Sequence, residues 1–217
     1  MSLSQTSAAP GANTSSPART GRVRTLDREA FDAACARLMQ HVLQDCQPDL
    51  LIGIRTGGLV VAEAMARTVG QKPIVMPLTS RRGSTGAKAR VKFLPALLTM
   101  LPGRLVDGLR ILEHRLLTPR RRAQGAQAQF VDPTEAAAIC DRLAGLPPGR
   151  VAVVVDDAVD SGVTLAAVLQ VLRSGTPSAE FRSAAITVTA EHPLAKPDYA
   201  LIHGELCRFP WSFDAAH

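Results

Sequence analysis

Residues 151–164 read Val-Ala-Val-Val-Val-Asp-Asp-Ala-Val-Asp-Ser-Gly-Val-Thr, and this stretch decides the fold. Its first five residues, 151–155, are uniformly apolar, which is typical of a parallel strand covered by helices on both faces. A helix is predicted to follow over Ser161–Leu172. Ligands of open α/β sheets bind beyond the carboxyl ends of such strands, so the polar residues between strand and helix are candidate site residues.

The chemistry of these polar residues favours a bound sugar phosphate. Asp156 and Asp157 can hold the hydroxyls of a ribose or the waters of a Mg²⁺ ion. Residues 161–164 place backbone N–H groups and two hydroxyls at a helix N-terminus, where the macrodipole favours a phosphate. Gly162 is expected to permit close approach of the ligand to the backbone. The alternative is that Asp160 or its neighbour only caps the helix.

Helical and strand patterns alternate on both sides of this stretch. Helices are predicted over 27–46 with Thr25 or Asp27 as N-cap, from Leu59 onward, and over 133–146 with Asp132 as N-cap; strands are predicted over 48–54, 73–78 and 183–189. Such alternation implies an α/β fold with a doubly wound, open parallel sheet. The stretch 92–146 does not fit the minimal alternation, and it is predicted to be a helical insertion or lid.

The composition sets broad limits on function. The chain has 217 residues, 46% of them hydrophobic and 20% charged, which suits one large domain. A formal net charge of +6 favours anionic partners, which include phosphorylated metabolites, nucleic acid and membrane surfaces. The four cysteines are widely spaced, which predicts free thiols in a reducing compartment such as the cytoplasm. No stretch is long and apolar enough to span a membrane, and residues 1–22 are predicted to be a disordered tail.

The order of apolar strand, two acids, three further residues and Ser-Gly-x-Thr resembles the signature of the type I phosphoribosyltransferases. The pattern is closest to the purine branch of that family, which acts on hypoxanthine, xanthine or guanine and also has an acid where Asp160 stands. The resemblance covers about residues 49–213. It implies a phosphoribosyltransferase-like domain over 23–217, in which about 92–146 form the insertion or lid and about 190–217 form a small hood that recognises the base.

The resemblance implies a role for each residue of the loop. Asp156 and Asp157 would hold the ribose hydroxyls of phosphoribosyl pyrophosphate and a Mg²⁺ ion. Asp160 would lie near N7 of a purine as general base or proton acceptor. The residues that would hold the 5′-phosphate are Ser161, Gly162, Val163 and Thr164.

Two other segments resemble parts of the family's site. The turn Arg55-Thr56-Gly57-Gly58 is similar to the pyrophosphate loop, in which one peptide bond is often cis. Arg55 would then contact pyrophosphate oxygens, because a guanidinium forms charge-assisted hydrogen bonds to them. Arg81 and Arg82 stand where the family has a mobile catalytic loop that closes over the donor. For each of these arginines, a solvated loop position is the alternative.

The carboxyl-terminal region resembles the base-recognition part of the purine enzymes. Phe209 or Trp211 would stack on the base, although a core or interface role is the alternative for Trp211. The purine enzymes also carry a lysine near the start of this region, and residues 188–191, Val-Thr-Ala-Glu, offer none. This departure leaves the identity of the base open.

Together these residues predict a Mg²⁺-dependent phosphoribosyltransferase, a homodimer that transfers the phosphoribosyl group to a nucleobase, with purines favoured. One alternative is a regulator on the same fold that senses phosphoribosyl pyrophosphate or nucleotides and binds RNA. Its phosphate contacts would come from the basic segment 104–122. Another is that residues 92–122 form an amphipathic surface for a membrane or a second subunit.

Overall fold

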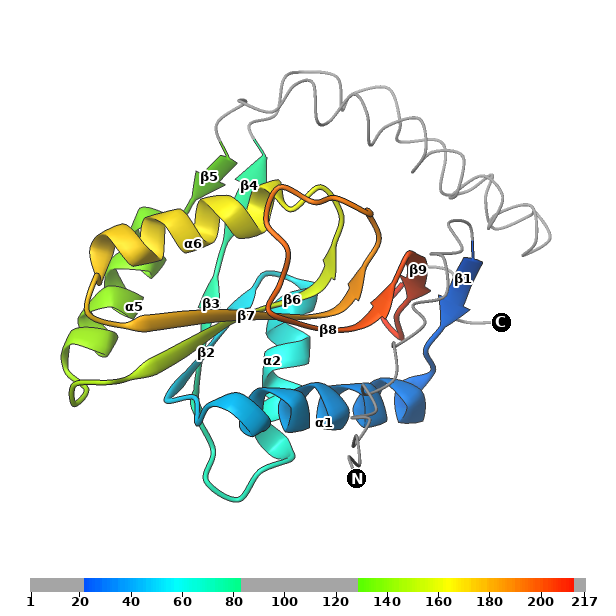
Figure 1. Ribbon diagram of the computed structural model, residues 1–217, viewed down its shortest axis with the longest axis horizontal. Helices are drawn as coiled ribbons and strands as arrows, with labels where there is room; N and C mark the ends of the chain where they lie inside the picture. Colours follow the sequence, from blue (N-terminus) through cyan, green and yellow to red (C-terminus); the bar gives the residue numbers. More distant parts are fainter. Residues whose placement is uncertain (1–21, 83–128, 213–217) are drawn as a thin grey trace, which may run out of the picture.

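The computed structural model describes residues 22–82 and 129–212 (Figure 1). At its centre is a five-stranded sheet with the strand order β3-β2-β6-β7-β8. The strands are β2 (Leu50–Ile54), β3 (Ile74–Leu78), β6 (Val151–Val159), β7 (Glu180–Val188) and β8 (Tyr199–His203). Every neighbouring pair is parallel, so the predicted open parallel sheet is confirmed.

Helices among the described residues cover both faces of the sheet (Figure 1). One face carries α1 (Arg28–Asp45) and α2 (Gly57–Arg67), and the other carries α5 (Pro133–Ala144) and α6 (Val163–Gly175). Successive side chains of a strand point to opposite faces. Leu51 and Val153 therefore pack with α1 and α2, whereas Leu50 and Val154 pack with α5 and α6. Burial on both sides explains why these strands are apolar throughout.

The predicted helix starts at Asp27 and Asp132 are confirmed. The Asp27 carboxylate accepts a hydrogen bond from the backbone N–H of Ala30 at 2.8 Å. The Asp132 carboxylate accepts from the N–H groups of Thr134 and Glu135 at 3.0 Å each. Each side chain thus satisfies N–H groups of a first helical turn that have no partner within the helix.

Strand β6 continues past the apolar run that predicted it, which corrects the expected loop. Asp156 and Asp157 are strand residues, because β7 runs alongside and pairs with β6 as far as Val159, opposite Val188. Helix α6 begins only at Val163, two residues later than predicted. Main-chain pairing therefore fixes the positions of the two acids.

Two short strand pairs lie outside the main sheet. β1 (Arg22–Thr25) pairs in parallel with β9 (Glu205–Arg208), and β4 (Ser80–Arg82) pairs antiparallel with β5 (Gln129–Val131). β1 was not predicted, because its four residues include no apolar run. The predicted tail 1–22 lies outside the described residues except for Arg22, the first residue of β1.

The segments predicted as insertion and hood contribute to the core layers. Residues 92–128 lie outside the described residues, but α5, which ends the same segment, packs on the sheet through Ala136, Ile139 and Leu143. Of the predicted hood, β8 is the edge strand of the main sheet and β9 pairs with β1.

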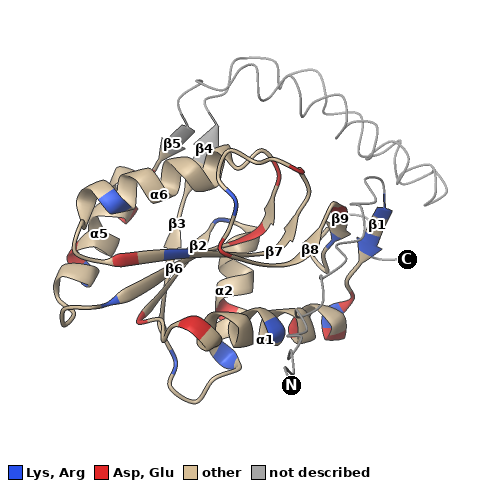
Figure 2. Ribbon diagram, viewed as in Figure 1, with Lys and Arg blue, Asp and Glu red and all other residues tan. Residues whose placement is uncertain are grey.

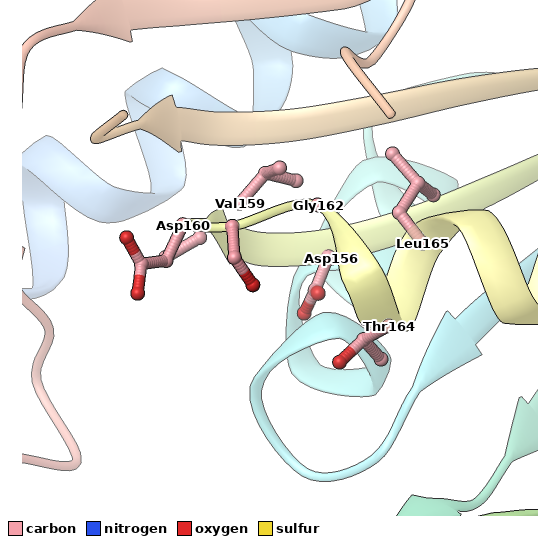
Figure 3. Close-up of a pocket in the computed structure, with 8 residues that line it drawn as sticks. Asp156, Val159, Asp160, Gly162, Thr164 and Leu165 are labelled. Carbon is pink, nitrogen blue, oxygen red and sulfur yellow. The ribbon is translucent and has the colours of Figure 1, made fainter. Parts of the chain in front are cut away.

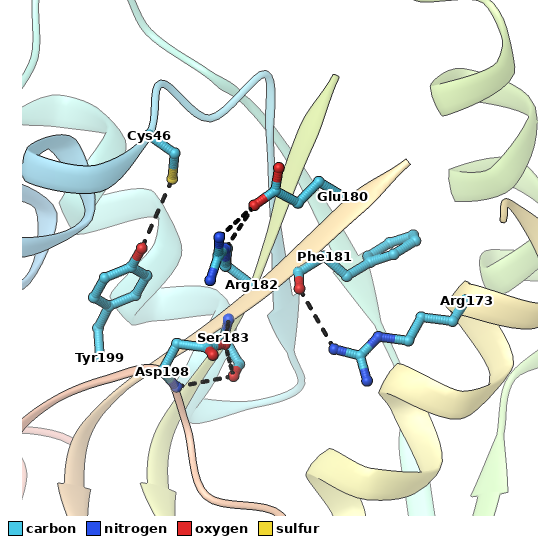
Figure 4. A network of polar contacts seen from close by, with 8 residues as sticks. All are labelled: Cys46, Arg173, Glu180, Phe181, Arg182, Ser183, Asp198 and Tyr199. Atoms are coloured by element: carbon cyan, nitrogen blue, oxygen red, sulfur yellow. Dashed lines mark hydrogen bonds and ion pairs between the residues drawn. The ribbon is translucent and has the colours of Figure 1, made fainter. Parts of the chain in front are cut away.

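A polar network joins β7 to the start of β8 (Figure 4). The Asp198 carboxylate accepts hydrogen bonds from the backbone N–H and the hydroxyl of Ser183, both at 2.7 Å. The Ser183 hydroxyl also accepts from the N–H of Asp198 at 3.1 Å. These contacts fix the register at which the edge strand begins, at the amino end of the sheet.

Candidate functional site

The candidate site lies at the carboxyl end of β6, where the chain turns into α6. A pocket there is lined by Asp156, Ala158, Val159, Asp160, Ser161, Gly162, Thr164 and Leu165. Figure 3 shows the side chains of Asp156, Asp160 and Thr164 on the strand end, turn and helix start that line this pocket. The pocket thus brings Asp160 together with three of the predicted phosphate residues, Ser161, Gly162 and Thr164. The aromatic candidates Phe209 and Trp211 do not line it.

The turn from β6 into α6 depends on Gly162 for its conformation and for its packing. Gly162 has a φ of 73°, in the left-handed region, and it is the N-cap of α6. A Cβ atom here would lie 2.5 Å from the carbonyl oxygen of Ala195. The N–H of Leu194 also donates to the carbonyl of Ser161 at 2.8 Å. The backbone of residues 194–195 therefore packs against Gly162, which a side chain at this position would prevent. The approach of a ligand to this glycine stays a prediction.

The paired acids are partly buried, and this shifts their pKa values. The backbone N–H of Asp157 donates to the Asp156 carboxylate at 2.9 Å. Burial, together with the charge of Asp157, raises the pKa of Asp156 well above its ordinary value of 3.8. Burial also raises the pKa of Asp157. A cation or a set of hydroxyls at this position would offset the cost of keeping the two carboxyls ionised.

The turn of Arg55, Thr56, Gly57 and Gly58 packs against the same acids. The Arg55–Thr56 peptide is cis, as the resemblance implies. A Cβ at Gly57 would overlap the Asp157 carboxylate, and one at Gly58 would overlap the carbonyl of Val155. The two glycines therefore let the turn after β2 close onto the end of β6. The predicted pyrophosphate turn and the predicted ribose-binding acids are in direct contact.

Arg55 is held by a residue that the sequence analysis missed. Its Nη2 atom donates to Oε1 of Glu135 at 3.2 Å, and its side chain is 45% exposed. The N–H of Thr79 donates to Oε2 of the same carboxylate at 2.5 Å. A Glu at the third position after an N-cap is a helix-start signal. Nothing in the sequence, however, connects Glu135 with a turn 80 residues earlier.

Thr189 is a second residue that the sequence analysis did not assign. Its buried hydroxyl lies 3.2 Å from Oδ1 of Asp160, and its N–H donates to the carbonyl of Val159 at 2.9 Å. Thr189 directly follows β7, in the region where the purine enzymes carry a lysine. In this chain the neutral hydroxyl of Thr189 lies beside Asp160, the candidate general base.

The two aromatic candidates differ in exposure. The rings of Phe209 and Trp211 stack with centroids 5.0 Å apart, and the edge of Phe31 meets Trp211 at 5.1 Å. Phe209 is only 5% exposed and belongs to the core, whereas Trp211 is 39% exposed. This corrects the expectation for Phe209, whose ring is part of the core, and leaves Trp211 as the candidate for stacking on a base.

The remaining predictions concern charge and metal ions. Arg81 and Arg82 lie on β4, next to residues 83–128, which are outside the described part. Figure 2 shows lysines and arginines spread over several helices and strands. Within 22–82 and 129–212, no helix could cross a membrane, and no group of three or more His, Cys, Asp or Glu residues could hold a metal ion.

The fold and site together define an α/β protein with a polar cavity at the carboxyl edge of a parallel sheet, the edge at which open α/β sheets bind ligands. The phosphoribosyl transferase domain family matches residues 24–215, and the chain belongs to this family. No curated protein sequence matches it.

Solved structures of similar fold include three with TM-scores above 0.5. A purine phosphoribosyltransferase from Pyrococcus horikoshii has a TM-score of 0.55 and 17% identity, over 88% of this chain and 94% of that one. A xanthine-guanine-hypoxanthine phosphoribosyltransferase from Helicobacter pylori has a TM-score of 0.56 and 18% identity, over 89% of this chain and 96% of that one. A hypothetical protein from Neisseria gonorrhoeae with bound ppGpp has a TM-score of 0.57 and 14% identity, over 88% of this chain and 89% of that one. These identities support the fold alone.

Replacement of Gly162 by Ala should destabilise the protein more than the same change at Gly149. Both glycines have positive φ, 73° and 82°, but no atom lies within 4 Å of a Cβ added at Gly149. G162A adds an overlap with the backbone of Ala195, so we expect a further loss of about 1–3 kcal/mol in the free energy of unfolding. Urea denaturation of both variants measures this difference, and equal losses would contradict the proposed packing.

Asp156→Asn should stabilise the protein at neutral pH. The folded chain holds the Asp156 proton more tightly than the unfolded chain, so the carboxyl disfavours folding increasingly as the pH rises above 3.8. The amide removes this penalty and keeps an acceptor for the N–H of Asp157. We expect Tm to rise by at least about 2–4 °C at pH 7.5, and the difference from wild type to shrink toward pH 4.

The matched control for D156N is Asp141→Asn, which removes an exposed carboxylate from α5. It should leave Tm unchanged. A Tm of D156N that is no higher than that of wild type at pH 7.5, or a gain of the same size at every pH, would show that burial of the Asp156 charge is not the cause.

Proposed function

We propose that the protein is a phosphoribosyltransferase that transfers the phosphoribosyl group of phosphoribosyl pyrophosphate to a purine base, with release of pyrophosphate. The observation that carries the proposal is the contact between Asp157 and the backbone of Gly57. Through this contact, a pair of partly buried acids lies between a basic glycine turn and the start of α6. A donor that carries phosphates at both ends of a ribose needs acids at its centre for the ribose hydroxyls and an anion-binding group on each side for the phosphates.

The donor would lie across the carboxyl end of β6. The backbone N–H groups of residues 161–164 would bind its 5′-phosphate, because the macrodipole of α6 favours negative charge at the start of the helix. Asp156 and Asp157 would accept hydrogen bonds from the ribose hydroxyls. The turn 55–58 would bind the pyrophosphate through the guanidinium and the backbone amides.

A Mg²⁺ ion fits this pair of acids, and we propose that the protein depends on it. Mg²⁺ prefers oxygen ligands, keeps several of its waters, and is often bound by one or two carboxylates together with substrate phosphates. Asp156 and Asp157 are oxygen donors whose raised pKa values reflect burial, which a nearby cation would offset. The ion would neutralise part of the charge that develops on pyrophosphate.

In the reaction, a ring nitrogen of the base would displace pyrophosphate from C1 of the ribose. Arg55 and the amides that follow it would stabilise the charge on the departing group. Asp160 would accept a proton from the base and orient it, with its carboxylate placed by the Thr189 hydroxyl at 3.2 Å. The side chain of Trp211 would stack on the base, and Arg81 and Arg82 would close over the donor.

A purine is favoured as the acceptor on two grounds. Asp160 occupies the position at which the purine enzymes have an acid, and two proteins of similar fold are purine phosphoribosyltransferases. The homodimer and the cytoplasmic location expected from the sequence remain part of the proposal.

A second candidate is a regulator that binds nucleotides at the same site. The Neisseria gonorrhoeae protein of similar fold was solved with bound ppGpp, which carries phosphate groups on a ribose, and the net charge of +6 suits anionic ligands. Such a regulator would bind RNA with a steep dependence on salt. The arginines at 120–122 that would contact the RNA lie outside the described residues.

A panel of purine and pyrimidine bases, incubated with phosphoribosyl pyrophosphate, Mg²⁺ and protein, tests the proposal through release of pyrophosphate. We expect a purine to be consumed, and Asp160→Asn to lower kcat by about 100-fold or more. Binding of the donor by D160N, measured by calorimetry, should stay at the wild-type level because Asp160 would contact the base and not the donor.

The exposed-charge variant D141N again serves as the control and should keep full activity. Donor binding without consumption of any base would overturn the transferase and favour the regulator, which RNA titrations at two salt concentrations would then examine. Equal loss of activity in D160N and D141N would show that a change in net charge, and no specific role of Asp160, is responsible.

A further inference from the structure

Glu135 connects three parts of the fold that meet beside the pyrophosphate turn. One carboxylate oxygen accepts from Nη2 of Arg55 at 3.2 Å, and the other accepts from the backbone N–H of Thr79 at 2.5 Å. Thr79 lies between the end of β3 and the start of β4. A single side chain of α5 thus contacts the turn that follows β2 and the segment that joins β3 to β4.

The position of the Glu135 carboxylate is determined by backbone contacts around it. Asp132 caps α5 and accepts from the N–H of Glu135 at 3.0 Å, while its own N–H donates to the carbonyl of Thr79 at 2.9 Å. Both polar groups of the Thr79 backbone therefore bind to residues 132–135. Glu135 has a side chain that is 27% exposed, so the carboxylate is held on a rigid helix start and is partly shielded from water.

Arg55 needs such a partner if it is to bind an anion at a fixed place. Its N–H donates to the carbonyl of Leu78 at 3.0 Å, which fixes its backbone, but its long side chain would otherwise sample many rotamers. A guanidinium has five N–H donors, and Glu135 accepts from one nitrogen, Nη2. The other donors can still bind phosphate oxygens.

We propose that Glu135 is a positioning residue that holds the Arg55 guanidinium ready for pyrophosphate, in the ground state and as the leaving group. This inference rests on the proposed function, because it concerns the pyrophosphate end of the same site. The direction of the effect of Glu135 on pyrophosphate affinity can be tested. A carboxylate that merely competed with the ligand for Arg55 would weaken pyrophosphate binding, whereas a positioning residue strengthens it.

The experiment measures binding of inorganic pyrophosphate with Mg²⁺ by calorimetry in wild type, Glu135→Gln, Arg55→Ala and the double variant. The glutamine keeps an acceptor for the N–H of Thr79 and removes only the ion pair, so the fold is expected to survive, which thermal melting verifies. An exposed ion pair contributes up to about 1 kcal/mol of interaction free energy. Loss of the Glu135–Arg55 pair in E135Q should therefore raise the Kd for pyrophosphate by up to about fivefold. In the R55A background, E135Q should have no further effect.

Glu180→Gln is the matched control. It removes a carboxylate from the exposed Glu180–Arg182 ion pair at the amino end of β7, away from the site, and should leave Kd unchanged. Steady-state rates provide a second readout, in which E135Q should raise KM for the donor while kcat falls by a smaller factor.

The outcomes separate this inference from the function on which it rests. Wild-type protein that fails to bind pyrophosphate would overturn both. Pyrophosphate binding by wild type with an equal or lower Kd for E135Q, or additive effects of E135Q and R55A, would overturn the role of Glu135 alone. A raised Kd that is absent in the R55A background would support it.

Discussion

Close contact between the ends of β2 and β6 is the constraint on which the site depends. The two strands are neighbours in the sheet, so the turn that follows β2 meets the last residues of β6. The turn can approach only because Gly57 and Gly58 have no side chain where the Asp157 carboxylate and the Val155 carbonyl lie. A residue with a Cβ at either position would separate the basic turn from the acids. The site therefore exists through backbone packing before any ligand arrives.

The two carboxyls at this contact lower the stability of the folded protein. Two adjacent carboxyls are partly buried, with raised pKa values, at the end of an otherwise apolar strand. Such an arrangement costs free energy in the absence of a ligand. A protein of marginal stability retains that cost where the groups bind something, and a cation with a polyhydroxylated anion would satisfy both carboxyls. The same groups that weaken the empty fold would thus contribute to binding.

Much of this arrangement could be predicted from local sequence. The strand 151–155 and the helix starts at Asp27 and Asp132 follow from uniform burial and from capping chemistry, which act over a few residues. The extension of β6 to Val159 could not be predicted in the same way, because it depends on pairing with β7. The Glu135–Arg55 pair was missed for a related reason. It joins residues brought together only by the strand order, and neither residue belongs to a pattern that includes the other.

Residues 189–195, which follow β7 and contain no recognisable motif, determine the conformation of the turn from β6 into α6. Thr189 places its hydroxyl 3.2 Å from the Asp160 carboxylate, and Leu194 donates to the carbonyl of Ser161 at 2.8 Å. These contacts fix the two ends of the turn from β6 into α6, and the backbone of Ala195 explains why Gly162 must be a glycine. Because Asp160 would act on the base and residues 161–164 on the phosphate, a change within 189–195 would alter both functions without touching either ligand. The conformation of the turn from β6 into α6 therefore depends on the sequence after β7 as well as on the residues of the turn itself.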